Sequence, residues 1–314
     1  DRERAPMYVV GETTGDHRFV FEQKDGVKPI DLAMSDMFGS SPKTTLTDTT
    51  VETKYTDGEY HEDDIERYAA SVLSLEAVAC KDWLTNKVDR SVTGKIARQQ
   101  CQGEIQLPLS DCGVVALDYS GTKGIATSIG HAPQVALIDS AKGSVMAVAE
   151  ALTNIVATPL SDGIKGLSLS ANWMWPCKNP GEDAALYRAV EACSEFACAL
   201  GVNIPTGKDS LSMTQKYGAD KVYAPGTVII SAAGEVSDVR KTLSPVLGKK
   251  GSVLYYIDFS SDSLKLGGSA LAQTQGKLGS ETPTVCDTAK FVTAFETVQT
   301  LVKRGKLMAA HDVS

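Results

Sequence analysis

A glutamate and an asparagine stand one helical turn apart in a segment that is otherwise almost wholly small and apolar. The segment runs from Ala141 to Val156, and the two residues are Glu150 and Asn154. Side chains four residues apart lie on the same face of a helix. A carboxylate and an amide oxygen in this arrangement suit Mg²⁺, which takes oxygen ligands and often bridges to phosphates. A plain surface pair, contributing about 0.2–0.5 kcal/mol, has the same spacing.

Two aspartates stand at the ends of predicted strands. Asp111 precedes a strand expected over 113–118, and Asp312 follows a strand expected over 307–310. Acidic residues at strand ends are common in ordinary loops, and they are also where α/β enzymes place metal ligands. For each aspartate taken alone, the sequence favours a structural role over metal binding.

The segment 203–213, with the sequence NIPTGKDSLSM, carries a glycine, a cation and a hydroxyl directly after a short predicted strand. Gly207 lets the backbone approach a ligand closely, and Lys208 and Ser210 can donate hydrogen bonds to a phosphate. An ordinary turn with a solvated lysine has the same features, so the spacing alone favours a turn.

A polar segment and two histidines add weaker candidates. Residues 89–100 contain Arg90, Lys95 and Arg98, which could steer an anionic substrate or belong to a solvated loop. His131 and His311 fit no local Ser–His–Asp or Cys–His arrangement, and no catalytic residue is assigned. The sequence has neither a GxxxxGK[ST] loop nor a GxGxxG fingerprint, so a nucleotide would need a different scaffold.

The elements that must position these residues begin near residue 75 as a compact unit of strands and helices. A Ser-, Thr- and Asp-rich stretch at 40–62 has linker composition, and strand-like alternation precedes it at 7–23. Hydrophobic periodicity predicts helices over 63–73, 141–156, 180–201 and 286–305, and strands over 164–171, 226–236 and 251–259, with a hairpin at Tyr217–Gly218. The fold class predicted is therefore mixed α/β (α+β).

Composition narrows the function classes. The 314 residues are 42% hydrophobic and 22% charged, as in ordinary globular proteins. A net charge of −8 argues against general nucleic-acid binding, which needs a basic face. The seven cysteines form no CxxC motif, which indicates reduced thiols in a cytoplasmic protein. No run of about 18 apolar residues predicts a membrane span, and both ends of the sequence suggest a piece of a longer polypeptide.

Ten segments in one order closely resemble the large, fused form of phosphoribosylformylglycinamidine synthase, the ATP-dependent amidotransferase of purine synthesis. The segments are DRERAP, PIDL, DRSVTGKIARQQ, SIGHAP, AEALTNI, LSANWMW, NPGEDAALY, IPTGKDSLSMT, VIISAAGEV and AAHDVS. Proteins of this family contain two fused halves, each similar to aminoimidazole ribonucleotide synthetase. The resemblance implies that this chain is an internal part of such a protein.

The resemblance also implies domain boundaries. Residues 1–38 would be the tail of the first half's C-terminal domain, and 39–74 a linker and a helix. Residues 75–240 would be the N-terminal domain of the second half. Residues 241–314 would begin that half's α-β-α C-terminal domain and stop before it is complete.

Site residues and ligands follow from the same resemblance. The family converts formylglycinamide ribonucleotide, glutamine and ATP into formylglycinamidine ribonucleotide, and its second half holds an auxiliary ADP with Mg²⁺. The matching residues are Asp111, Glu150, Asn154 and Asp312 as metal ligands, Lys81, Ser110 and Ser314 as nucleotide contacts, and Gly207, Lys208 and Ser210 as substrate or ATP contacts. For Ser110 only a backbone contact is implied.

Two alternatives stay open at this point. The half could be a non-catalytic brace stabilised by bound nucleotide. The chain could also be another ATP enzyme with the same superfold, such as an aminoimidazole ribonucleotide synthetase, a selenophosphate synthetase or a thiamine-phosphate kinase. The first half and the glutaminase domain would be its partners within one polypeptide, so the chain alone is expected to be inactive. An uncovered apolar sheet face is expected, which self-association would cover.

Overall fold

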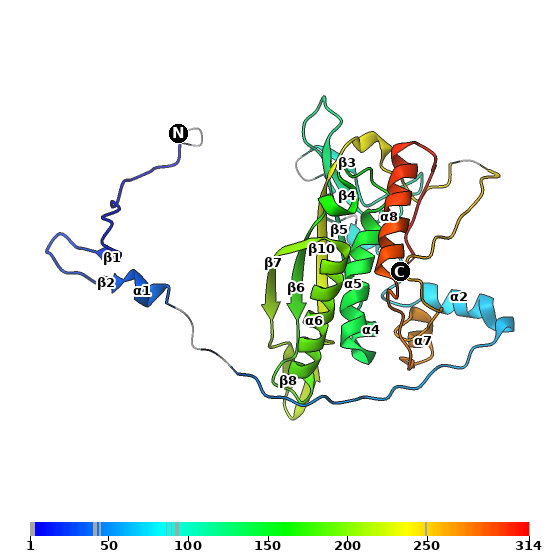
Figure 1. Ribbon diagram of the computed structural model, residues 1–314, viewed down its shortest axis with the longest axis horizontal. Helices are drawn as coiled ribbons and strands as arrows, with labels where there is room; N and C mark the ends of the chain where they lie inside the picture. The colour runs from blue at the N-terminus through cyan, green and yellow to red at the C-terminus, as the bar shows by residue number, and fades with distance from the viewer. Residues whose placement is uncertain are drawn as a thin grey trace. The chain divides into compact units, whose positions relative to one another are not determined.

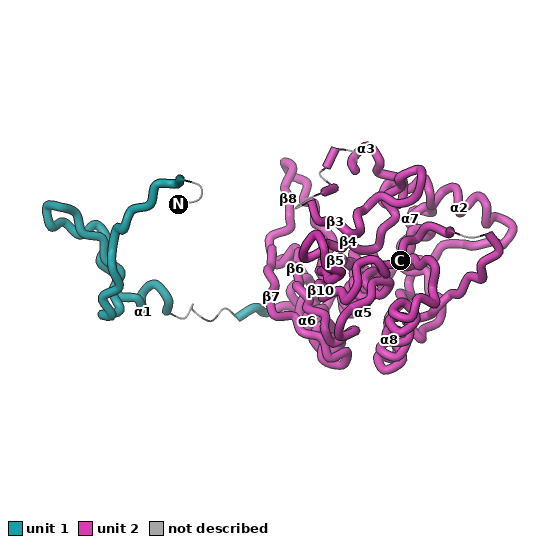
Figure 2. Tube along the Cα trace, turned by 90° about the horizontal axis from the view of Figure 1, so that it is seen from above, with its two compact units in different colours: residues 1–47 teal, residues 48–314 magenta. Residues whose placement is uncertain are grey.

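The computed structural model describes residues 4–39, 43, 45–85, 87–88, 90–91, 94–248 and 250–313. The chain divides into two compact units, Asp1–Thr47 and Asp48–Ser314 (Figure 2). The first unit holds an antiparallel hairpin of β1 (Arg18–Phe21) and β2 (Ile30–Ala33), followed by the short helix α1 (Met34–Met37). This division does not test the domain boundaries expected at 38/39, 74/75 and 240/241, which remain predictions.

A six-stranded mixed sheet forms the centre of the second unit. Its strand order is β3-β4-β5-β10-β6-β7. All neighbours run antiparallel except β6 and β7, which are parallel because α6 connects them as a crossover. The strands are β3 (Ile96–Arg98), β4 (Gly113–Ala116), β5 (Gly124–His131), β6 (Ser168–Met174), β7 (Asn203–Ser210) and β10 (Thr227–Val236). The mixed α/β fold class is confirmed.

Helices cover one face of this sheet (Figure 1). They are α4 (Pro133–Ile138), α5 (Ser140–Ile155) and α6 (Glu182–Leu200), and α8 (Thr288–Lys303) packs against α6. Along β5 buried and exposed residues alternate strictly, so every second side chain enters the core beneath α5. On the other face Ile125 and Ile129 are 44% and 57% exposed, which matches the uncovered apolar face expected from the sequence.

The two central helices have clear start signals. The Asp139 carboxylate accepts a hydrogen bond from the Lys142 backbone N–H at the start of α5. At the start of α6 the carboxylate of Asp48 accepts from the backbone N–H groups of Gly181, Asp183 and Ala184. Asp48 lies 133 residues before Gly181, so the segment that precedes the domain supplies this cap.

The helix α8 is held against the domain by a buried amide. Gln299, which is 1% exposed, accepts a hydrogen bond from the Leu160 N–H and donates to the carbonyl oxygens of Val156 and Thr158. Phe291 and Phe295 lie on the same side of the helix and are fully buried. The last predicted helix, 286–305, therefore forms nearly as expected and packs into the core.

Several predicted elements take other forms. Residues 251–259 and 307–310, both predicted strands, form no strand. The strand predicted over 164–171 begins only at Ser168, because 163–166 is the 3₁₀ turn η2 (Gly163–Gly166). The polar segment 89–100, treated as a loop, contains β3. The hairpin at Tyr217–Gly218 is confirmed as β8 (Thr214–Tyr217) and β9 (Asp220–Tyr223).

The remaining elements are short. They are η1 (Glu62–Asp64), α2 (Ile65–Leu73), α3 (Asp82–Thr85), η3 (Val239–Lys241) and α7 (Ala270–Thr274). Among the residues that the structure describes, no helix combines the length and the apolar character needed to cross a bilayer.

Candidate functional site

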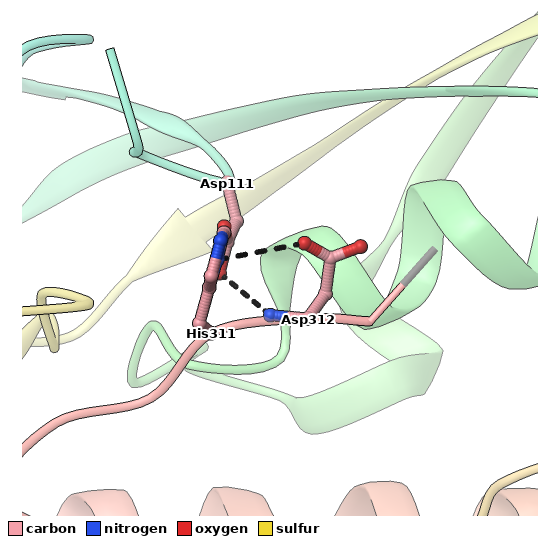
Figure 3. Close-up of side chains that lie close together, drawn as sticks. All are labelled: Asp111, His311 and Asp312. Carbon is pink, nitrogen blue, oxygen red and sulfur yellow. Dashed lines mark hydrogen bonds and ion pairs between the residues drawn. The ribbon is translucent and has the colours of Figure 1, made fainter. Parts of the chain in front are cut away.

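Two carboxylates and an imidazole from opposite parts of the sequence meet beside β4. The Asp111 Oδ1 lies 2.5 Å from the His311 Nδ1, and the Asp111 Oδ2 accepts a hydrogen bond of 3.2 Å from the Asp312 backbone N–H. The Asp312 Oδ1 lies 3.7 Å from the same His311 nitrogen (Figure 3). One ligand atom from each of the three residues lies within 4.8 Å of the other two. The chain thus joins positions 200 residues apart in one cluster.

Burial shapes the acidity of this cluster. The side chains of Asp111 and Asp312 are 8% and 10% exposed, whereas His311 is 51% exposed. Desolvation on burial, followed by the nearby negative charge of Asp312, raises the pKa of Asp111 to about 6, although His311 opposes the shift. Two carboxylates packed this closely repel each other, and a divalent cation would remove that repulsion.

A small cavity of about 10 Å³ opens beside Asp111. Ser110 and Asn154 line it together with Asp111, so three of the residues implied by the family resemblance meet in one place. Its wall is completed by Arg98, Cys112, Ala157, Leu243 and Pro245. The Ser110 Oγ is buried and has no hydrogen-bond partner, and the Ser110 backbone N–H donates to the Gln100 carbonyl oxygen at 3.2 Å.

Helix α5 presents its two polar residues differently. Asn154 is 9% exposed, and its Nδ2 donates to the Ile129 carbonyl oxygen at 2.9 Å. This hydrogen bond uses the nitrogen, so the Oδ1 is the atom that can coordinate a cation. Glu150 is half-buried, and its Oε2 accepts from the His131 backbone N–H at 3.3 Å. Glu150 is not among the described residues that line the cavity.

The other implied nucleotide contacts are not brought to this cavity. The Lys81 ammonium donates to the carbonyl oxygens of Glu76 and Ala79, close to it in sequence. Lys81 is not among the described residues around the cavity. Ser314 lies outside the described residues.

The GKDS segment forms the end of a strand and not a turn after one. Gly207, Lys208 and Ser210 all belong to β7, the edge strand of the sheet, and the Lys208 Nζ donates to the Ser210 Oγ at 2.8 Å. A Cβ at position 207 would lie 2.6 Å from the Ala171 carbonyl oxygen, so the glycine here permits close strand pairing. The expectation of a corner that follows the strand was wrong, because parallel pairing with β6 continues through Ser210.

The donor set at Asp111 fits a magnesium ion. Carboxylate oxygens of Asp111 and Asp312 and the amide oxygen of Asn154 are the hard ligands that Mg²⁺ prefers. The unpartnered Ser110 hydroxyl beside them is a donor available to a phosphate oxygen. The observed geometry therefore suits a divalent cation together with a phosphate-bearing ligand.

Sequence reasoning gave no role to two residues of this site. His311 was noticed only as a neighbour of Asp312, and Arg98 only as one cation of a polar segment. An arginine that follows Ile96 and Ala97 in an alternating strand pattern is a signal that could have identified Arg98 as partly buried. No local signal predicts that His311 meets Asp111.

Comparison with known proteins concerns mainly the sheet domain. Residues 80–235 match the family model of the FGAR-AT PurM_N-like domain. Among solved structures, T. maritima PurL complexed with FGAR is 15% identical, with a TM-score of 0.50, and the match covers 80% of this chain and 36% of that one. PurLQS from Thermotoga maritima is also 15% identical, with a TM-score of 0.49, and that match covers 72% of this chain and 33% of that one.

These similarities identify the fold of the sheet domain as PurM_N-like. At 15% identity the structural match concerns the fold alone. The chain spans about a third of the length of the solved proteins that it matches.

Proposed function

We propose that the chain is part of a phosphoribosylformylglycinamidine synthase of the large, fused form. Such an enzyme is an ATP-dependent C–N ligase that converts formylglycinamide ribonucleotide, glutamine and ATP into formylglycinamidine ribonucleotide. The match of residues 80–235 to the FGAR-AT PurM_N-like domain supports this assignment, as does the shared fold with a PurL whose structure contains FGAR. Glutamine hydrolysis would occur elsewhere in the same polypeptide, in the cytoplasm.

Within this enzyme we assign an auxiliary ADP and Mg²⁺ site to the Asp111 cluster. Asp111, Asp312 and Asn154 would hold the metal, with Glu150 one turn from Asn154 as a further ligand. Lys81, Ser110 and Ser314 would contact the nucleotide, and Gly207, Lys208 and Ser210 would face substrate or ATP. Bound Mg²⁺ would offset the negative charge of the phosphates.

The observation that carries this proposal is the meeting of Asp111 and Asp312. Two nearly buried carboxylates within one hydrogen-bonded cluster are costly without a compensating cation. Asn154 lines the cavity beside Asp111 and adds a neutral oxygen to the same place. The proposed function supplies the cation and the phosphates that this arrangement lacks.

Calorimetric titration of the chain with ADP tests the proposal. Wild-type protein should bind ADP with Mg²⁺ present and at least about tenfold more weakly with EDTA. Asp312→Asn should lose the magnesium dependence, whereas Asp220→Asn, in the exposed strand β9, should keep it. Equal ADP binding by wild-type protein with Mg²⁺ and with EDTA would contradict the proposed site.

A specific observation favours a bracing role for this site within the enzyme. The cluster joins Asp111, two residues before β4, to His311, 200 residues later. A bound metal would therefore cross-link the sheet domain to the end of the described chain. Ligand at a hundredfold excess over its Kd would then stabilise the fold by about 2.7 kcal/mol.

Glu150→Ala in the full-length enzyme separates a brace from a catalytic centre. A lower melting temperature with unchanged activity per folded molecule supports the brace. Lost activity in a fully folded protein supports chemistry at this site.

We also propose that the uncovered sheet face is a contact surface for another part of the enzyme. Ile125 and Ile129 of β5 would pack against the first half of the enzyme, and in the isolated chain against a second copy. Light scattering at high concentration should therefore detect self-association, and the chain alone should form no amidine product from ATP and ammonia. A strictly monomeric chain would contradict the first expectation, and measured product would contradict the second.

A further inference from the structure

Arg98 is a half-buried cation whose hydrogen bonds to other described residues reach only neutral groups. Its Nη1 donates to the Gln102 Oε1 at 2.8 Å, and its Nη2 donates to the Thr242 carbonyl oxygen at 2.7 Å. Its Nε is buried and has no hydrogen-bond partner among the residues that the structure describes. In the described part of the chain, no carboxylate forms an ion pair with this guanidinium.

This environment is unfavourable for an arginine. Burial lowers the pKa of Arg98, because desolvation disfavours the charged form, and the side chain keeps its charge nonetheless. A buried donor without an acceptor carries the full cost of its desolvation. An anion that accepts from Nε would remove both penalties at once.

The cavity beside Asp111 places Arg98 next to the proposed nucleotide site. Arg98 lines this cavity with Ser110, Asp111 and Asn154. The carboxylate of Asp111 contacts His311 and the Asp312 backbone, and its ion pair is with His311. The Ser110 Oγ is a second buried polar atom without a partner on the same wall.

The space around Arg98 suits one oxygen of a larger anion. The cavity of about 10 Å³ admits roughly one water-sized group. On another side Arg98 lines a more open polar pocket of about 350 Å³, together with Gln99, Gln102 and Gln106. A ligand can therefore reach the guanidinium from solvent without unfolding the sheet.

We propose that Arg98 is a phosphate-binding residue, and that its Nε and the Ser110 hydroxyl donate to one phosphate oxygen beside the Asp111 cluster. The identification of that phosphate as part of a nucleotide rests on the proposed function. The role of Arg98 as an anion anchor rests on its own geometry. Arg98 supplies the positive charge on one side of the phosphate, and Asp111 and Asp312 supply the metal ligands on the other.

Affinities of the folded chain for ADP, pyrophosphate and adenosine, measured with Mg²⁺, test this role. Arg98→Met keeps an unbranched side chain but removes the charge and the donors. The variant should weaken the affinity for ADP and for pyrophosphate roughly 10- to 100-fold, and its affinity for adenosine should stay within about twofold of the wild-type value. Gln102→Met is the matched control, because it removes the Nη1 partner and leaves Nε in place, so its affinities should stay within about threefold.

The outcomes separate this inference from the proposed function. Pyrophosphate binding that depends on Arg98, without any ADP binding, supports the anion anchor and contradicts the nucleotide site. Normal ADP binding by Arg98→Met supports the nucleotide site and overturns the anchor, as it would if a water molecule alone occupied the cavity. Equal losses of affinity for ADP and for adenosine also overturn the anchor role of Arg98, because a general disturbance of the fold would explain them.

A second variant covers the case in which Arg98→Met does not fold. Arg98→Lys keeps the charge and lacks the Nε donor, so it should fold and bind pyrophosphate more weakly than wild type. Unchanged pyrophosphate affinity in Arg98→Lys would overturn the assigned role of Nε.

Discussion

Two apolar stretches in the last seventy residues of the chain differ in burial: one packs into the core and the other is exposed. The helix α8 buries Phe291 and Phe295 completely. Residues 251–258 leave Val253, Leu254 and Tyr255 72%, 74% and 80% exposed. A helix satisfies its own backbone and needs only one apolar face against a core. A strand needs a neighbour for its backbone groups, and the described residues place none beside 251–258.

Packing density gives the largest expected difference in stability, between the buried core around β5 and the segment that leads into the exposed stretch. A Cβ at Gly130 in β5 would overlap the Ala147 carbonyl oxygen and the Ala151 nitrogen of α5. Gly130→Ala should therefore cost about 4 kcal/mol of unfolding free energy, or prevent folding. Gly248→Ala, with nothing within 4 Å, should change it by less than about 0.5 kcal/mol. Similar urea midpoints for the two variants would refute the comparison.

The docking of α8 gives the next largest effect. Gln299→Leu would leave the Leu160 N–H and the carbonyl oxygens of Val156 and Thr158 buried without their partner. We expect a loss of about 2–3 kcal/mol, because unmade buried hydrogen bonds carry their desolvation cost. Thr297→Ala, on the exposed side of α8, serves as the control. A loss no greater than that of the control would mean that apolar packing alone holds the helix.

At the Asp111 cluster we expect a smaller change in unfolding free energy, and there the substitution stabilises the protein. Because the pKa of Asp111 is raised to about 6 in the folded state, its contribution to stability is present below about pH 4 and is lost as pH rises through 6. Asp111→Asn resembles the protonated form, so in EDTA at pH 7.5 it should be about 1–3 kcal/mol more stable than wild type. The two proteins should converge near pH 4. A denaturation experiment in which the variant has a lower unfolding free energy than wild type at pH 7.5 would contradict this effect of burial.

Sequence periodicity predicted the elements that satisfy their own backbone. The helices α5, α6 and α8 match the predicted segments 141–156, 180–201 and 286–305 to within one or two residues at each end. The strand predicted at 251–259 was wrong, because periodicity describes the side chains and cannot supply a neighbouring strand. The end of β7 was also misjudged, because Gly207 suggested a turn where the chain needs close strand pairing.

The candidate site was only partly accessible to local sequence reasoning. The spacing of Glu150 and Asn154 predicts a shared helix face, and both lie on α5. The meeting of Asp111 with Asp312 depends on how the last segment returns to β4, which no local pattern encodes. Family resemblance suggested that pair, and the geometry brings it together. The setting of Arg98 depends on the neighbours of β3 in three dimensions, so sequence alone left it among polar loop residues.

The most direct test of the proposed metal site is a crystal structure of the chain with ADP and Mn²⁺, which replaces Mg²⁺ and gives an anomalous signal. We predict an anomalous peak within about 2.5 Å of carboxylate oxygens from both Asp111 and Asp312, with the ADP phosphates bound to the same ion. Bound ADP with no anomalous peak at these carboxylates, or with its metal held by other residues, would contradict the account.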